Sequence, residues 1–119
     1  VQVMRGTDDG RHWALAHRFA PGEAFHVHSV HYDHYRDRFW VLTGDTDAES
    51  RVLYTDDHFA SLHTLGGGSQ DWRVVTMIIT RDALYWGSDD DTERGASIFR
   101  YDLGAHRLER QQHIGQVSY

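Results

Sequence analysis

A nine-residue segment recurs 44 positions further along the chain. Residues 39–47 (FWVLTGDTD) are matched by residues 83–91 (ALYWGSDDD). At the same offset, residues 28–31 fall on residues 72–75, so the segments that precede the match align as well. Self-similarity at a fixed period of 20–50 residues is typical of folds in which one supersecondary unit is repeated.

Short β-prone runs separated by Gly and Asp clusters fill the chain, and helical periodicity is missing almost everywhere. Four strands in each period of about 44–48 residues are typical of β-propeller blades. The sequence therefore predicts an all-β fold of four-stranded antiparallel blades, with about two and a half blades in the 119 residues. The expected strands are residues 1–5, 12–19, 26–32, 38–43, 51–54, 61–65, 73–80, 83–87, 97–101 and 108–114.

Aspartate-containing turns supply a further register. Residues 6–13 (GTDDGRHW) fit the pattern Ser/Thr-x-Asp-x-Gly-x-x-Trp except at the first position, and two later turns keep parts of it. An Asp ahead of a tight turn can accept hydrogen bonds from the turn's N–H groups, while Gly adopts positive φ. We therefore assign structural roles to the residues of these turns: Asp8, Gly10, Trp13, Asp56, Asp102 and Gly104.

With these turns and this repeat, the chain resembles the BNR/Asp-box repeat proteins, the sialidase-like or glycosyl hydrolase-like β-propellers. The resemblance covers roughly residues 3–108. It implies a propeller that binds or hydrolyses carbohydrate. A retaining sialidase also needs an arginine cluster, a tyrosine nucleophile with an acidic partner and a separate acid. The sequence does not show that set.

The strand count predicts how the blades divide the chain. Residues 1–24 are expected to form the outer two strands of one blade, 25–68 and 69–115 two full blades, and 116–119 the start of another. Closed propellers need roughly four to eight blades. Because the chain starts inside a blade and at Val1, we expect a piece of a longer propeller. The alternative is that several copies close the ring. The expected partners are accordingly further blades of the same protein or further copies.

Composition excludes several function classes. The chain has no Cys, which excludes disulfides, thiolate catalysis and cysteine-based zinc sites. Its net charge is −6 with no basic stripe, which argues against nucleic acid as a partner. No apolar run is long enough for a transmembrane helix and no signal peptide is recognisable, so the sequence predicts no membrane span and assigns no compartment.

Ligand sites of propellers gather where inner strands of several blades converge, and the start of one inner strand holds His26 and His28. Alternation along a strand places these two on one side and His31 on the other. Paired imidazoles can bind Zn²⁺, Mn²⁺ or a substrate carboxylate. The alternative is that they pack between blades. Spacing identifies no third ligand, so a divalent metal is a weaker hypothesis and no cofactor is required.

The segment that enters the next inner strand contains Gln70, Trp72 and Arg73. The repeat alignment puts Arg73 beside the position of His28. A guanidinium there can clamp a carboxylate, and an indole ring can stack on a sugar. An ion pair between Arg73 and an Asp of a neighbouring blade is at least as compatible with the sequence.

Two acidic loops follow the matched strands, at residues 45–49 and 89–93. Their carboxylates can ligate Ca²⁺ or act as general acids, but they lack the spacing of an EF-hand loop. Because Asp45 and Asp89 occupy the same place in both repeats, we expect them to share a structural role.

Two functions from different classes follow from these features. The first is a glycoside hydrolase-like enzyme, and the alternative is a non-catalytic propeller that binds a glycan or protein at its channel mouth. Convergence of several titratable groups at one site favours the enzyme, whereas isolated groups favour binding.

Overall fold

The computed structural model describes residues 1–115, and the predicted start of a further blade at 116–119 lies outside them. Within the described residues the chain forms strands and two short 3₁₀ turns, η1 (Asp8–Gly10) and η2 (Gln70–Trp72). The strands are β1 (Gln2–Thr7), β2 (His12–Arg18), β3 (His26–Asp33), β4 (Arg38–Gly44), β5 (Arg51–Thr55), β6 (His63–Gly67), β7 (Ile78–Ile79), β8 (Ala83–Gly87), β9 (Ser97–Asp102) and β10 (Arg107–His113).

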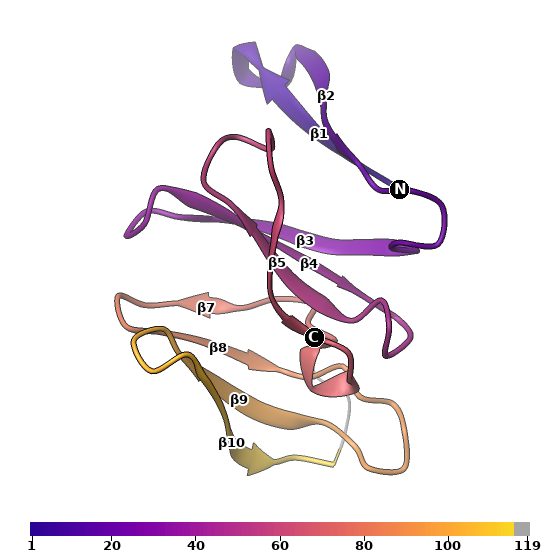
Figure 1. Ribbon diagram of the computed structural model, residues 1–119, viewed down its shortest axis with the longest axis vertical. Coiled ribbons are helices and arrows are strands. Elements are labelled where there is room, and N and C mark those ends of the chain that lie inside the picture. Colours follow the sequence, from indigo (N-terminus) through magenta and orange to yellow (C-terminus); the bar gives the residue numbers. More distant parts are fainter. Residues whose placement is uncertain (116–119) are drawn as a thin grey trace.

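These strands pair into three antiparallel sheets. Strands β1 and β2 form a hairpin, whereas β3–β6 and β7–β10 each form a four-stranded sheet in which neighbours in sequence are neighbours in space. Figure 1 shows the hairpin, the β3–β6 sheet and the β7–β10 sheet following one another along the long axis of the molecule. The predicted all-β fold with four-stranded antiparallel sheets is confirmed.

The β3–β6 sheet is apolar on both faces, which explains why β4 (RFWVLTG) is a nearly continuous run of apolar residues. Because side chains alternate along a strand, Trp40 and Leu42 join the core shared with the β7–β10 sheet, and Val41 joins the core shared with the hairpin. All three side chains are fully buried. The middle sheet therefore connects the two cores.

The predicted inner strand at 73–80 is much shorter than expected. Only β7 (Ile78–Ile79) pairs as a strand, with one isolated bridge between Val74 and Ser88. The carbonyl groups of Val74 and Val75 accept hydrogen bonds from side chains of the neighbouring sheet instead of from strand β8. Contacts between the sheets thus replace part of the backbone hydrogen bonding expected between β7 and β8. The sequence pattern does not reveal this replacement.

The repeat offset also changes within the unit. Trp40 pairs with His31 in one sheet and Leu84 pairs with Ile79 in the other, so the second strands are offset by 44 residues but the first strands by 48. Between these equivalent pairs lie eight residues (32–39) in the first sheet and four (80–83) in the second, so the first connection is four residues longer. The alignment of residues 28–31 with 72–75 is therefore wrong.

The aspartate turns differ from one another. Asp102 matches the expected chemistry, since its Oδ1 accepts hydrogen bonds from the N–H groups of Gly104 and Ala105 at 3.0 and 2.8 Å. In the β1–β2 turn, by contrast, Asp8 pairs with the ring of His12 at 2.9 Å, while Gly10 has the expected positive φ of 83°.

The turn between β5 and β6 uses a different aspartate from the predicted one. Asp57 accepts hydrogen bonds from the hydroxyl and the N–H of Ser61, at 2.6 and 2.9 Å, and these bonds lower its pKa to about 2. The predicted Asp56 forms an ion pair with Arg38 at 2.8 Å. The aspartate that accepts hydrogen bonds from this turn is therefore one residue later than the sequence pattern indicated.

Candidate functional site

A β-bulge in β3 sets the direction of its polar side chains. The register with β4 shifts between Val27 and Ser29, which leaves His28 without a cross-strand partner. Residues opposite one another in an antiparallel pair share a face of the sheet, so the bulge turns His26, His28, Ser29 and His31 toward the β7–β10 sheet. The expectation that His31 faces the other way is wrong, because simple alternation ignores the extra residue.

The bulge gives His28 and Ser29 backbone partners in the neighbouring sheet. The hydroxyl of Ser29 donates to the carbonyl of Val75 at 2.6 Å, and Nδ1 of His28 lies 2.9 Å from the carbonyl of Val74. A carbonyl oxygen only accepts, so Nδ1 of His28 carries a proton. In a neutral imidazole, Nε2 then keeps its lone pair. The His28 side chain is only 12% exposed.

Space for this imidazole comes from Gly44, the cross-strand partner of His26. A Cβ atom at position 44 would lie 2.5 Å from Cε1 of His28, which is far inside van der Waals contact. Any other residue at this position would displace the ring. The glycine ahead of the acidic loop thus has a packing role at the site.

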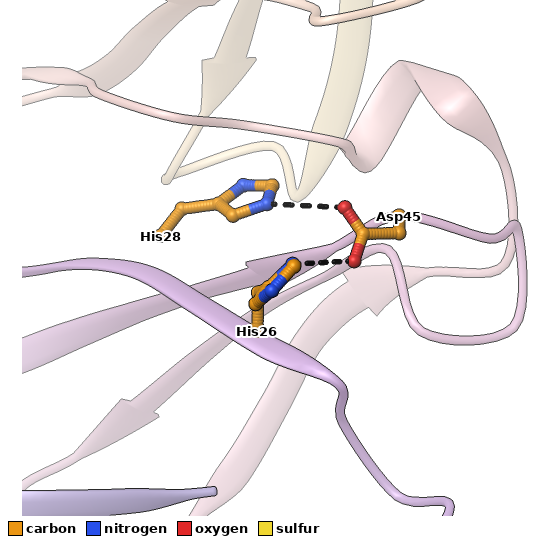
Figure 2. Close-up of side chains that lie close together, drawn as sticks. All are labelled: His26, His28 and Asp45. Carbon is orange, nitrogen blue, oxygen red and sulfur yellow. Dashed lines mark hydrogen bonds and ion pairs between the residues drawn. The ribbon is translucent and has the colours of Figure 1, made fainter.

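Asp45 lies between the two histidines (Figure 2). Its Oδ2 is 2.6 Å from Nδ1 of His26, and its Oδ1 is 3.8 Å from Nε2 of His28. The φ angle of Asp45 is 143°, in the region that favours glycine, so surrounding contacts hold it there at a cost in backbone strain. One ligand atom from each of His26, His28 and Asp45 lies within 4.8 Å of the other two.

Arg73 connects this group to the second acidic loop. Its Nη2 is 3.2 Å from Asp89 and 4.0 Å from Asp45, and its Nη1 is 2.9 Å from Asp91. The two aspartates at equivalent positions of the repeat thus share one guanidinium nitrogen across the sheets. Three carboxylates surround a single guanidinium group that is 15% exposed, so the cluster carries more negative than positive charge when His26 and His28 are neutral.

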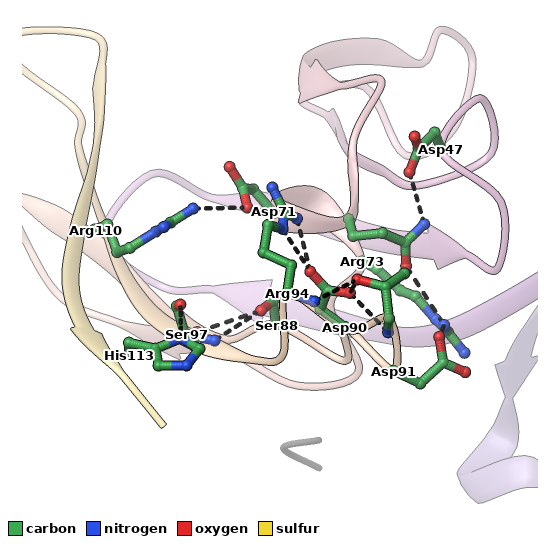
Figure 3. A network of polar contacts seen from close by, with 12 residues as sticks. Asp47, Asp71, Arg73, Ser88, Asp90, Asp91, Arg94, Ser97, Arg110 and His113 are labelled. Carbon is green, nitrogen blue, oxygen red and sulfur yellow. Dashed lines mark hydrogen bonds and ion pairs between the residues drawn. The ribbon is translucent and has the colours of Figure 1, made fainter. Parts of the chain in front are cut away.

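Gln70, which is nearly buried, joins the first acidic loop to Arg73. Its amide nitrogen donates to the carbonyl of Asp45 at 3.2 Å and to the carboxylate of Asp47 at 2.8 Å, and its amide oxygen accepts from Arg73 at 3.4 Å. Figure 3 shows Asp47, Arg73 and Asp91 in this network. The amide therefore positions the loop that carries Asp45.

Trp72 is partly buried and packs against the hydrophobic core. Its ring centroid is 5.5 Å from that of Trp86 and 5.9 Å from that of Tyr101, and a Cβ at Gly66 would lie 2.2 Å from its ring. The ring packs against the hydrophobic core between the two four-stranded sheets. These aromatic contacts give Trp72 a packing role between the two sheets, where a sugar-stacking role was expected.

Adjacent carboxyl groups in the second loop have pKa values shifted in opposite directions. Burial raises the pKa of Asp89, and neighbouring carboxylates add to the rise against the opposing charge of Arg73. Burial would also raise the pKa of Asp90, but hydrogen bonds from Thr92 and Arg94 hold it below its usual value. Of the two, Asp89 is better suited to exchange a proton.

The structure brings together most of the residues that the sequence singled out. The predicted residues that meet at this end of the sheets are His26, His28, Asp45, Gln70, Arg73 and Asp89. Sequence reasoning did not single out Asp47, Asp91 or the Val74 carbonyl. The two aspartates lie in the acidic loops, but nothing in the loop composition distinguishes them from their neighbours.

Comparisons with protein-family models, with curated proteins and with solved structures find no match to this chain. Within residues 1–115, no helix has the length and the apolar character needed to cross a membrane.

Proposed function

We propose that the three sheets are successive blades of a β-propeller of the Asp-box type, and that the cluster around Asp45 is its ligand-binding centre. Supporting this proposal, each complete sheet is a four-stranded antiparallel meander, and neighbouring sheets pack through apolar faces. His26 and His28 lie at the start of β3, the first strand of its sheet, which would be the innermost strand of a blade.

The outer faces of the stack also suit further blades. Met4, Trp13 and Leu15 are exposed on the hairpin, where register places them on one face. On the far side of the β7–β10 sheet, Ile78 and Ile98 are exposed beside a pocket of about 270 Å³. Apolar end faces are expected if each blade packs against the next, either in the same protein or in another copy.

The best-fitting ligand class for the cluster is a neutral carbohydrate. The observation that carries this proposal is that Arg73 is already surrounded by Asp45, Asp89 and Asp91. A sugar carboxylate, such as that of sialic acid, would enter a region with excess negative charge. Hydroxyl groups, in contrast, can donate to the carboxylates and bind without that repulsion.

A glycan array that presents neutral and sialylated glycans to the protein tests this proposal. We expect neutral glycans to bind better than sialylated ones, and His26→Ala to weaken binding. His26 is more than half exposed, so its removal leaves the core intact. The matched control is His12→Ala, which removes another exposed His–Asp pair in the turn between β1 and β2 and leaves the cluster unchanged. Selective binding of sialylated glycans, or binding to no glycan, would contradict the proposal.

Glycoside hydrolysis is a second candidate function because of Asp89. Its carboxyl group is nearly buried, has a raised pKa and belongs to the same cluster as the two histidines. A carboxyl group of this kind is suited to general acid catalysis. If the protein is a hydrolase, release of an aryl leaving group from neutral glycosides will be lost in Asp89→Asn while glycan binding remains. If the protein binds glycans but does not hydrolyse them, only the non-catalytic binding function remains.

A further inference from the structure

We infer that His26, His28 and Asp45 form a binding site for a divalent transition metal of the Zn²⁺ class. Because Nδ1 of His28 donates to the Val74 carbonyl, the neutral ring directs an unprotonated Nε2 toward Asp45 Oδ1 at 3.8 Å. Two acceptors then face each other with no proton between them. This arrangement favours a cation between the imidazole and the carboxylate.

The backbone contact of His28 also matches the way proteins orient metal-binding imidazoles. A ligating His commonly donates its second ring N–H to a carboxylate or a backbone carbonyl, which fixes the tautomer and the ring orientation. The β-bulge supplies this orientation by placing the ring against the neighbouring sheet. Gly44 supplies the space, because any Cβ there would collide with the ring.

The distances require only small adjustments. Zinc bonds of 2.0–2.1 Å at tetrahedral angles place two ligand atoms about 3.4 Å apart. The three ligand atoms here lie within 4.8 Å of one another, and His26 Nδ1 is 2.6 Å from Asp45 Oδ2. Movements of about 1.5 Å or less would therefore form the site. In the metal-free protein, the proton of the hydrogen bond between His26 and Asp45 lies where the metal ion would bind, and the metal would replace it.

Charge and ligand type select the class of metal. Asp45, Asp89 and Asp91 surround Arg73, which leaves an excess of two negative charges when all three carboxyl groups are ionised and both imidazoles are neutral. One divalent cation would balance this excess. Two imidazole nitrogens and one carboxylate favour Zn²⁺ and its neighbours over Ca²⁺ or Mg²⁺, which prefer oxygen ligands. Three protein ligands leave a further position for water or a ligand hydroxyl group.

Calorimetric titration of the protein with Zn²⁺, after chelator treatment and without any glycan, tests the inference. We expect saturable binding of one Zn²⁺ per chain at this site. His26→Ala and Asp45→Asn should each weaken it at least about 10-fold, since even substitutions of residues that only orient the metal ligands cost roughly 10–100-fold. Both side chains are partly exposed, so these variants are expected to fold. Co²⁺ should give ligand-field absorption bands typical of a low-coordinate site, and both variants should lose them.

The control is His12→Ala, which removes another His–Asp pair with a 2.9 Å contact but only one imidazole. This variant should bind Zn²⁺ at the cluster as the unmodified protein does. Absence of saturable binding up to millimolar Zn²⁺, or binding that neither His26→Ala nor Asp45→Asn weakens, would overturn the inference. Because no glycan is present, failure of the carbohydrate proposal would leave this result unaffected.

Discussion

Replacing Trp40 with Ala is expected to lower the free energy of unfolding by about 3–5 kcal/mol, the usual cost of deleting a buried aromatic side chain. Trp40 is fully buried in β4 and belongs to the core between the two four-stranded sheets. Its ring also lies 5.6 Å from that of Tyr54. Small domains are stable by about 5–15 kcal/mol, so this loss is a large share of the total. Equilibrium urea unfolding measures it.

Trp13→Ala is the matched control, because it removes the same side chain from an exposed position. The Trp13 side chain is 64% exposed on the outer face of the hairpin. The sequence pattern assigned Trp13 a structural role in the β1–β2 turn, but because the side chain is largely exposed, we expect its removal to change the unfolding free energy by no more than about 0.5 kcal/mol, as for most surface substitutions. Equal losses for the two variants would show that the sheets do not pack around Trp40. If Trp40→Ala does not fold, Trp40→Phe gives a smaller, measurable loss.

Asp33→Asn is the second substitution with a large expected effect. The Asp33 carboxylate is fully buried and accepts hydrogen bonds from Arg36 at 2.8 Å, from the indole N–H of Trp40 at 3.0 Å and from the N–H of Tyr35 at 2.9 Å. The amide removes the charge that pairs with Arg36 and turns donors toward other donors. Because breaking a buried ion pair leaves its partner uncompensated, we expect a loss of about 3–5 kcal/mol in the free energy of unfolding near neutral pH.

This loss should depend on pH. Burial would raise the pKa of Asp33, but the hydrogen bonds from Arg36 and Trp40 hold it below its usual value of 3.8. A carboxyl group with a lowered folded-state pKa stabilises the protein above its unfolded pKa, and the stabilisation disappears as the pH falls through the folded value. The gap between the protein and Asp33→Asn should therefore be constant above about pH 4–5 and narrow at lower pH. A gap that widens on acidification would contradict this account.

The fold class was predictable because short β-prone runs, and their repetition along the chain, can be recognised in the sequence without knowing how the sheets pack. The short β-prone runs and the repeated segments at 39–47 and 83–91 were sufficient to predict four-stranded antiparallel sheets. The inner strands were less predictable. Their offset changes from 44 to 48 residues because one turn is longer, and carbonyl groups near Val74 bond to side chains of another sheet. Such contacts arise only when the sheets pack.

The site was predictable in its members but not in its geometry. His26, His28, Asp45 and Arg73 were recognisable as chemically capable residues near the starts of strands or in acidic loops. The orientation of His28 depends on a β-bulge that alternation does not reveal, and the partners of Arg73 depend on which loops lie across from it. Trp72, in contrast, was expected to stack on a sugar, but it is partly buried and contacts two other aromatic rings at the edge of the core.

His28 presents an unprotonated Nε2 to Asp45 because its Nδ1 donates to the backbone carbonyl of Val74. Long-range ¹H–¹⁵N correlation of the imidazole nitrogens in the metal-free protein tests this directly, with His28→Gln to assign the signals. The spectrum should be recorded at mildly alkaline pH, where imidazole rings are generally neutral. We predict a single Nδ1–H tautomer for His28, with Nε2 shifting when Zn²⁺ is added. An Nε2–H tautomer, or a ring protonated on both nitrogens at that pH, would contradict the account.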